Sequence, residues 1–276
     1  MKPDFWLEQI PLWGVFFLTV ALVLLSILIG TVLGQRRRRQ PNHETEASLG
    51  PIISSTLGLL AFMLAFTFGI TAERFQTRRQ FLLDEVNAIS TTYLRAGLLL
   101  EPHRSQLREL LREYVDTRAN VVKEDTKQQM QKLQEVISRS ESLQSQMWSH
   151  AVALAKADRS SEIDALFISS LNEMIDLHTS RLTVFSYRVP PAIWHILFFI
   201  TFLSMLTVGY QAGLLDKKVL KIGIVLALAF SAVVLLIADL DRGAEGRLQV
   251  SQRPMIELQK KMQMPIQETG YEQTQK

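Results

Sequence analysis

The chain has 276 residues, of which 47% are hydrophobic, with a mean hydropathy of +0.12 and a formal net charge of +3. The apolar residues lie in four blocks separated by polar, charge-rich sequence, a distribution typical of a membrane protein rather than of one soluble domain. No cysteine is present, which excludes disulfides, cysteine nucleophiles and thiolate metal sites. The small positive excess lies beside an apolar block, and this indicates membrane topology rather than nucleic-acid binding.

The sequence predicts an all-α integral membrane protein with four transmembrane helices and a helical-bundle extramembrane domain inserted between spans 2 and 3. The first apolar block carries no charge and can cross a hydrocarbon core of about 30 Å. A signal peptide is the alternative for this block, but the positive charges follow it rather than precede it. The expected segments are an N-terminal segment (1-11), transmembrane helix 1 (12-34), a basic loop (35-50), transmembrane helix 2 (51-72), the extramembrane domain (73-190), transmembrane helix 3 (191-215), transmembrane helix 4 (219-238) and a polar C-terminal tail (239-276).

The inserted domain has apolar residues at helical spacing and contains few helix breakers, namely Gly97 and Pro102. This pattern predicts a continuation of span 2 to about Gly97, followed by helices at 103–123, 126–157 and 160–188. Ser161 and Asp164 resemble a capping box at the start of the last helix. The chain beyond Ser251 is rich in Gln and Lys, and we expect it to be mobile or loosely helical.

Positive charges near the spans give an expectation for topology. The loops after spans 1 and 3 carry seven basic residues, and the two termini carry four, so this count places both termini and the helical domain outside the cytoplasm. The seven are Arg36, Arg37, Arg38, Arg39, Lys217, Lys218 and Lys221; the four are Lys2, Arg242, Arg247 and Arg253. Three arginines after span 2 argue for the opposite orientation.

Small residues recur every four positions in span 2, at Ala61, Ala65 and Gly69. Such a stripe lets helices approach closely in lipid, so we expect helix packing along this face, although small residues are common in any span. Just beyond the span lie Arg74, Arg78 and Arg79. Their expected role is to reach lipid headgroups; the alternative is a basic ring at a pore mouth that concentrates anions.

The stretch from Leu57 to Ala96 resembles the bestrophin-like membrane proteins of bacteria, in particular their branch of unknown function. The shared features are an apolar span containing LGLLAF, the boundary ERFQTRR, and an acidic helix that ends in YLRA. In this chain they include Glu73, Arg74, Arg78, Arg79, Asp84, Glu85, Asn87, Ala88, Tyr93, Leu94, Arg95 and Ala96. The resemblance is best over residues 52–118, and the four-span layout extends it along most of the chain.

This resemblance implies a homo-oligomer in the lipid bilayer, in which span 2 lines a central pore narrowed by apolar side chains. The matching positions are Phe62 and Phe66, which share one helical face. A narrow apolar ring can gate an ion pathway because it does not hold water. Alternatively, both rings face lipid or another helix. Bestrophins carry their domain in the cytoplasm, against the charge count above, and the cluster that forms their calcium clasp is matched here only by Asp239, Asp241 and Glu245.

No catalytic motif is present. The five histidines are scattered without metal-ligand spacing, there is no P-loop, GxGxxG or GxSxG, and Asp176 and His178 face different ways on a helix. We therefore expect no enzyme activity, cofactor, metal or nucleic-acid partner. The predicted function is an oligomeric channel for an inorganic ion in a bacterial inner (cytoplasmic) membrane. The alternative is a non-conducting sensor or scaffold whose helical domain binds a partner.

Overall fold

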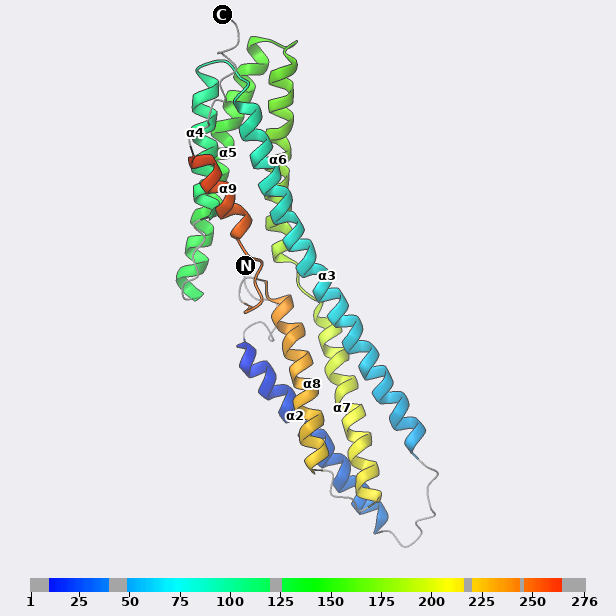
Figure 1. The fold of residues 1–276 in the computed structure, drawn as a ribbon. Helices are drawn as coiled ribbons and strands as arrows, with labels where there is room; N and C mark the ends of the chain where they lie inside the picture. Colours follow the sequence, from blue (N-terminus) through cyan, green and yellow to red (C-terminus); the bar gives the residue numbers. More distant parts are fainter. Residues whose placement is uncertain (1–9, 40–48, 120–125, 216–219, 244–245, 265–276) are drawn as a thin grey trace, which may run out of the picture. The chain divides into compact units, whose positions relative to one another are not determined.

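The computed structural model describes residues 10–39, 49–119, 126–215, 220–243 and 246–264. All regular secondary structure in these residues is helical, as Figure 1 shows, which confirms the predicted all-α class. The helices are α2 (Leu12–Arg38), α3 (Gly50–Ala96), α4 (His103–Ala119), α5 (Thr126–Ala157), α6 (Glu162–Ser186), α7 (Pro191–Leu214), α8 (Leu220–Asp241) and α9 (Arg253–Gln263).

The chain divides into two compact units, which are described separately. Unit 1 comprises residues 1–76 and 187–249, and unit 2 comprises residues 77–186 and 250–276. The helix α3 is unbroken over its 47 residues and contributes to both units. Its continuity follows from its sequence, since the only proline lies in the first turn, where a missing N–H costs no hydrogen bond.

Unit 1 contains the four apolar segments. The helices that carry them, α2, α3, α7 and α8, are long and apolar enough to cross a membrane, so the four predicted spans are confirmed. The preceding helix ends at Ser186, before the Pro190-Pro191 pair, and Pro191 is the first residue of α7, as expected for a proline at a helix start. The core of unit 1 includes the fully buried Trp194, whose ring stacks on Phe198.

Two glycine pairs bring α2 and α7 into backbone contact within unit 1. A Cβ added at Gly30 would lie 2.1 Å from the carbonyl oxygen of Leu206, and one added at Gly209 would lie 2.1 Å from that of Ile27. The second glycine of each helix, four residues on, is equally confined. Each helix thus presents a GxxxG motif to the other, the arrangement that allows close packing where no hydrophobic force drives association.

Unit 2 packs the second part of α3 with α4, α5 and α6 around an apolar core that includes Tyr114, Phe167 and Leu107. Asp164 donates its N–H to Ser161 Oγ at 3.2 Å, which confirms the predicted N-cap of α6. The predicted helix 103–123 ends at Ala119, and residues 120–125 lie outside the described part of the chain.

The C-terminal segment differs from the sequence expectation of a mobile or loosely helical tail. Residues Arg253–Gln263 form α9, which buries Met255, Leu258 and Met262 in the core of unit 2. Arg112 donates to the carbonyl oxygen of Met262 at 3.0 Å. The three apolar residues recur at spacings of three and four, so a short amphipathic pattern within Gln- and Lys-rich sequence was the signal for this helix.

Candidate functional site on the exposed face of α3

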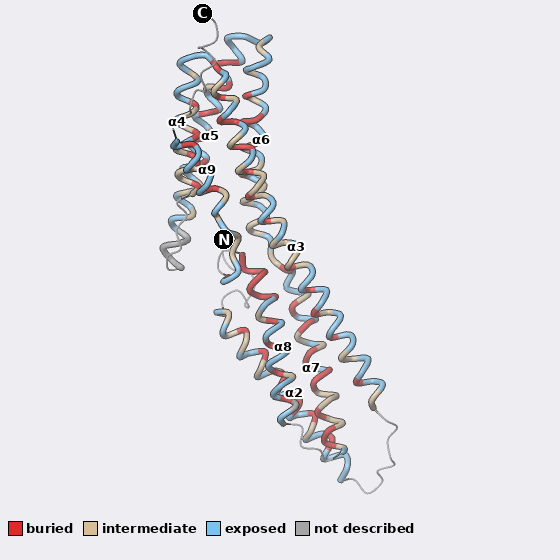
Figure 2. The backbone as a smooth tube through the Cα atoms, in the orientation of Figure 1, coloured by how far each residue is buried: buried red, intermediate tan, exposed pale blue. Residues whose placement is uncertain are grey.

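Within unit 1, α3 buries one stripe and leaves its remaining surface open. The stripe consists of residues at helical spacing, which are Ile53, Leu60, Leu64, Thr67 and Thr71. The hydroxyl groups of Thr67 and Thr71 donate to carbonyl oxygens of the preceding helical turn, so they are satisfied without a partner helix. Figure 2 shows the consequence, because α3 is coloured mostly as exposed or intermediate.

Phe62 and Phe66 lie on the open surface of α3. Their side chains are 63% and 51% exposed, and the rings stack with centroids 6.2 Å apart and an interplanar angle of 15°. The two rings form a short aromatic ladder that faces away from the other described helices of unit 1. In a membrane such a surface can contact lipid, another subunit or a pore.

The predicted packing stripe of Ala61, Ala65 and Gly69 is also exposed. A Cβ added at Gly69, or at Gly58 on the same helix, would meet no atom within 4 Å. The stripe therefore packs against no described helix of its own protomer. Close packing along it stays a prediction and requires a second chain.

The three arginines that follow the span have different surroundings. Arg74 Nη1 lies 3.9 Å from Oδ1 of the buried Asp241, and that carboxylate also accepts the N–H of Val189 at 2.9 Å. Arg78 is buried, whereas Arg79 is exposed. Arg74 thus compensates a carboxylate at the end of α8, and Arg79 presents its charge to the surroundings of the chain.

The basic run at the end of α2 is exposed at each of its positions. Arg36, Arg37 and Arg38 form the last turn of the helix, where the helix dipole stabilises positive charges. Arg39 follows as the C-cap. This placement leaves their predicted role in topology as an expectation.

Charged residues of both signs near the end of α8 bind backbone groups of unit 1. Asp239 Oδ1 accepts the N–H of Arg247 at 2.5 Å, and Arg242 donates to the carbonyl oxygen of Ile10 at 2.6 Å. These hydrogen bonds hold the backbone in place near the end of α8. Glu245, which the sequence grouped with them, lies outside the described residues.

Unit 2 contains a buried charged network that sequence reasoning missed, although Glu85 lies in the stretch of family resemblance. Glu85 is fully buried and forms ion pairs with Arg118, at 3.0 Å, and with Arg181. Tyr114 donates its hydroxyl to the same carboxylate at 3.2 Å. His178 Nδ1 lies 3.1 Å from the Tyr114 oxygen. The network thus joins α3, α4 and α6.

The protonation of this network follows from competing effects. Burial favours the neutral acid at Glu85, but the His178 contact and the positive charges of Arg118 and Arg181 outweigh it and lower the pKa of the carboxyl. Burial and the nearby Glu85 charge raise the pKa of Tyr114, which therefore stays a hydroxyl donor. The carboxylate is accordingly the acceptor at the centre of the network.

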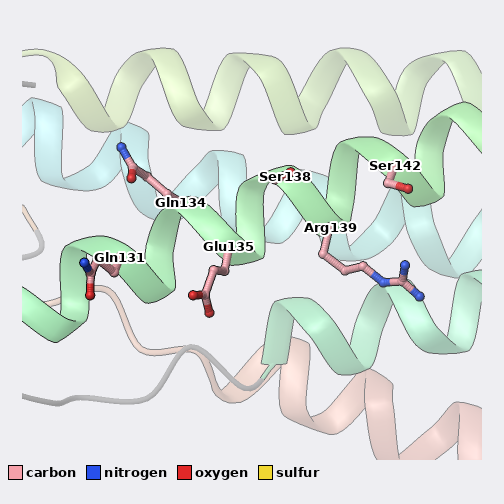
Figure 3. Close-up of a pocket in the computed structure, with 6 residues that line it drawn as sticks. All are labelled: Gln131, Gln134, Glu135, Ser138, Arg139 and Ser142. Carbon is pink, nitrogen blue, oxygen red and sulfur yellow. The ribbon is translucent and has the colours of Figure 1, made fainter.

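An open hollow on the surface of unit 2, shown in Figure 3, is lined by residues of α5 alone. Its lining is polar and comprises Gln131, Gln134, Glu135, Ser138, Arg139 and Ser142. Arg139 forms an ion pair with Glu113 of α4. The hollow lacks the converging groups from several elements that mark a ligand pocket.

The Bestrophin-like domain family matches residues 20–255 of the chain. Similar solved structures include a membrane protein with a single substitution, at 15% identity and a TM-score of 0.65, covering 90% of this chain and 97% of that one. Two variants of a bacterial bestrophin homologue from Klebsiella pneumoniae have 14% and 15% identity and TM-scores of 0.62 and 0.64. They cover 90% and 89% of this chain and 97% of their own. No curated protein matches significantly.

The fold and the four apolar helices define a multi-pass helical membrane protein. With the family match over most of its length, the chain belongs to the bestrophin-like family. The similarity to the Klebsiella structures establishes a shared bestrophin fold.

Proposed function

We propose that this protein is an oligomeric ion channel of a bacterial inner membrane, in which α3 lines the central pore. The observation that carries the proposal is the open face of α3, where the stacked rings of Phe62 and Phe66 are exposed on the surface of the protomer. Family membership supports it, since bestrophin-like proteins are a channel-type family rather than an enzyme family. The lipid bilayer, further copies of the chain and an inorganic ion are the partners that this function requires.

In the proposed assembly, copies of the chain surround an axis and each contributes the two aromatic rings. Rings from several subunits form a narrow apolar constriction, from which water withdraws when the passage is tight. The small residues Ala61, Ala65 and Gly69 then allow a neighbouring helix to approach α3 closely. Arg79, exposed beyond the span, adds positive potential near that end of the helix.

The direct test is ion flux into liposomes that contain the purified protein. Phe62→Ala and Phe66→Ala remove rings from the constriction, and we expect each to raise the flux severalfold because the widened passage holds water more readily. Phe199→Ala is the matched control, since Phe199 is equally exposed on α7. Equal flux in all three variants and the wild type would contradict a gate at these rings.

A non-conducting sensor or scaffold is the second candidate, and one observation in unit 2 favours it. Leu94 of α3, Leu98 in the turn that follows α3, and Ile163 and Leu166 of α6 are exposed. Arg95 joins α3 to α6 by donating to the Leu166 carbonyl oxygen at 2.8 Å. An apolar surface of this kind on a domain outside the membrane can bind a partner protein. A monomer in detergent with no flux in liposomes would favour this candidate over the channel.

A further inference from the structure

The exposed face of α3 that carries the stacked phenylalanine rings also carries a negative charge. Glu73 lies seven residues after Phe66 and eleven after Phe62, which is about two and about three helical turns, so the three side chains share one face of the helix. The Glu73 side chain is exposed. Between the rings and this carboxylate lies Gly69, where an added Cβ would meet no atom within 4 Å. The aromatic face therefore continues to a carboxylate.

The positive charges that follow Glu73 lie on other faces of α3. The helix is uncharged over residues 50–72, and its one other charged residue within unit 1 is Arg74. The Arg74 side chain is directed to α8, because its Nη1 lies 3.9 Å from Oδ1 of the buried Asp241. Arg79 comes six residues after Glu73, which places it about a third of a turn away around the helix. In unit 1 the charge on the aromatic face is thus a carboxylate.

We propose that Glu73 makes the pathway along this face of α3 selective for inorganic cations. The inference rests on the proposed channel and names the sign of the ion that it conducts. Copies of the chain around one axis place this carboxylate at the same height in each subunit, because the subunits of a closed symmetric oligomer are equivalent. The carboxylates then form a ring, and a ring of acidic side chains at a pore attracts cations and repels anions.

The distance between the carboxylate and the rings determines how the charge acts. A rise of about 1.5 Å per residue places Glu73 about 10 Å from Phe66 along the helix axis. This is close to the distance over which dissolved salt screens a charge, which is about 8 Å at physiological ionic strength. The carboxylates therefore raise the concentration of cations at the entrance of the apolar constriction. The phenylalanine rings carry no net charge, so the entrance sets the sign of the ion that passes.

The test is the reversal potential of the full-length protein in a phosphatidylcholine bilayer that separates two concentrations of KCl, whose two ions have nearly equal mobility in water. We expect the wild type to favour K⁺ over Cl⁻ by about tenfold. Glu73→Gln removes the charge but keeps the shape of the side chain, and we expect it to lower this ratio severalfold. Glu257→Gln is the matched control, because Glu257 is exposed on α9 in unit 2, and it should keep the wild-type ratio.

Two further variants separate the effect of the charge from that of side-chain packing. Glu73→Asp keeps the negative charge on a shorter side chain, and we expect it to retain the preference for K⁺. Glu73→Lys reverses the charge of the ring, and we expect it to shift the preference toward Cl⁻. Loss of the K⁺ preference in Glu73→Asp to the same extent as in Glu73→Gln would show that packing, rather than charge, is responsible.

The outcomes distinguish this inference from the proposed channel itself. The preference of the wild type should weaken as the KCl concentration is raised on both sides, because salt screens the ring of carboxylates. A current that favours Cl⁻ in the wild type, or a wild-type ratio in Glu73→Gln, would overturn the cation selectivity and leave the channel standing. Absence of current from the wild type and all variants would contradict the channel, and this inference with it.

Discussion

At the scale of single residues, Glu85 has the most demanding environment in unit 2. Its carboxylate is fully buried and forms ion pairs with two arginines, Arg118 and Arg181. Removing one partner of a buried ion pair leaves the others uncompensated, which costs more than the pair itself contributes. The network therefore fixes the mutual positions of α3, α4 and α6 through one side chain.

We expect Glu85→Gln to lower the free energy of unfolding by about 3–5 kcal/mol. Glu113→Gln is the control, because its ion pair with Arg139 is largely exposed and contributes at most about 1 kcal/mol. The pKa of Glu85 is lower in the folded state than its ordinary 4.5, so its stabilisation is present above pH 4.5 and decreases as the pH falls below that value. Chemical denaturation between pH 6 and 3 should show a steeper loss in the wild type than in Glu85→Gln; parallel losses would contradict this role.

At the scale of helices, the contact between α2 and α7 depends on the absence of side chains. The Cβ distance of 2.1 Å at Gly209 is to a backbone carbonyl oxygen, which cannot rotate away as a side chain can. Any larger residue must therefore separate the two helices, with loss of packing along both GxxxG motifs.

Gly209→Ala should destabilise the protein by about 1–3 kcal/mol, the usual cost of overpacking a close contact. Gly223→Ala on α8 is the control, since its added Cβ would lie 3.3 Å from the flexible end of Ile27. Thermal unfolding in detergent measures both. An equal Tm for the two variants would show that α2 and α7 do not depend on the backbone contact.

Sequence reasoning succeeded where local physics decides the structure. Apolar runs predicted the four spans because a bilayer requires long uncharged helices, and Ser161 predicted the start of α6 because a cap acts within one turn. It failed where distant residues meet. The regular stripe at Ala61, Ala65 and Gly69 pointed to α3 as a helix-packing surface. Within the protomer, the close contact built on glycines instead joins α2 to α7.

The same limit applies to the candidate sites. The network around Glu85 depends on which helices pack together, and no spacing in one sequence reveals that. The exposed phenylalanines of α3 were accessible through their i, i+4 spacing and the family resemblance. Their orientation away from the protomer became visible only with the packed helices of unit 1.

At the scale of the whole molecule, the proposed channel requires that the open face of α3 borders water in an assembly of several copies. Because the chain has no cysteine, a single thiol can be introduced at a chosen position, and no other residue of the chain will react with a thiol reagent in its place. Phe66→Cys places the thiol on that face, and Val225→Cys places one at a similarly exposed position of α8.

The decisive measurement is the ionic current of each cysteine variant during exposure to a charged, water-soluble thiol reagent. Such reagents attack thiolates, which form in water rather than in lipid. We predict that the current through Phe66→Cys changes irreversibly, whereas the current through Val225→Cys stays constant. A current through Phe66→Cys that is unaffected by the reagent would contradict the central claim that α3 lines the pore.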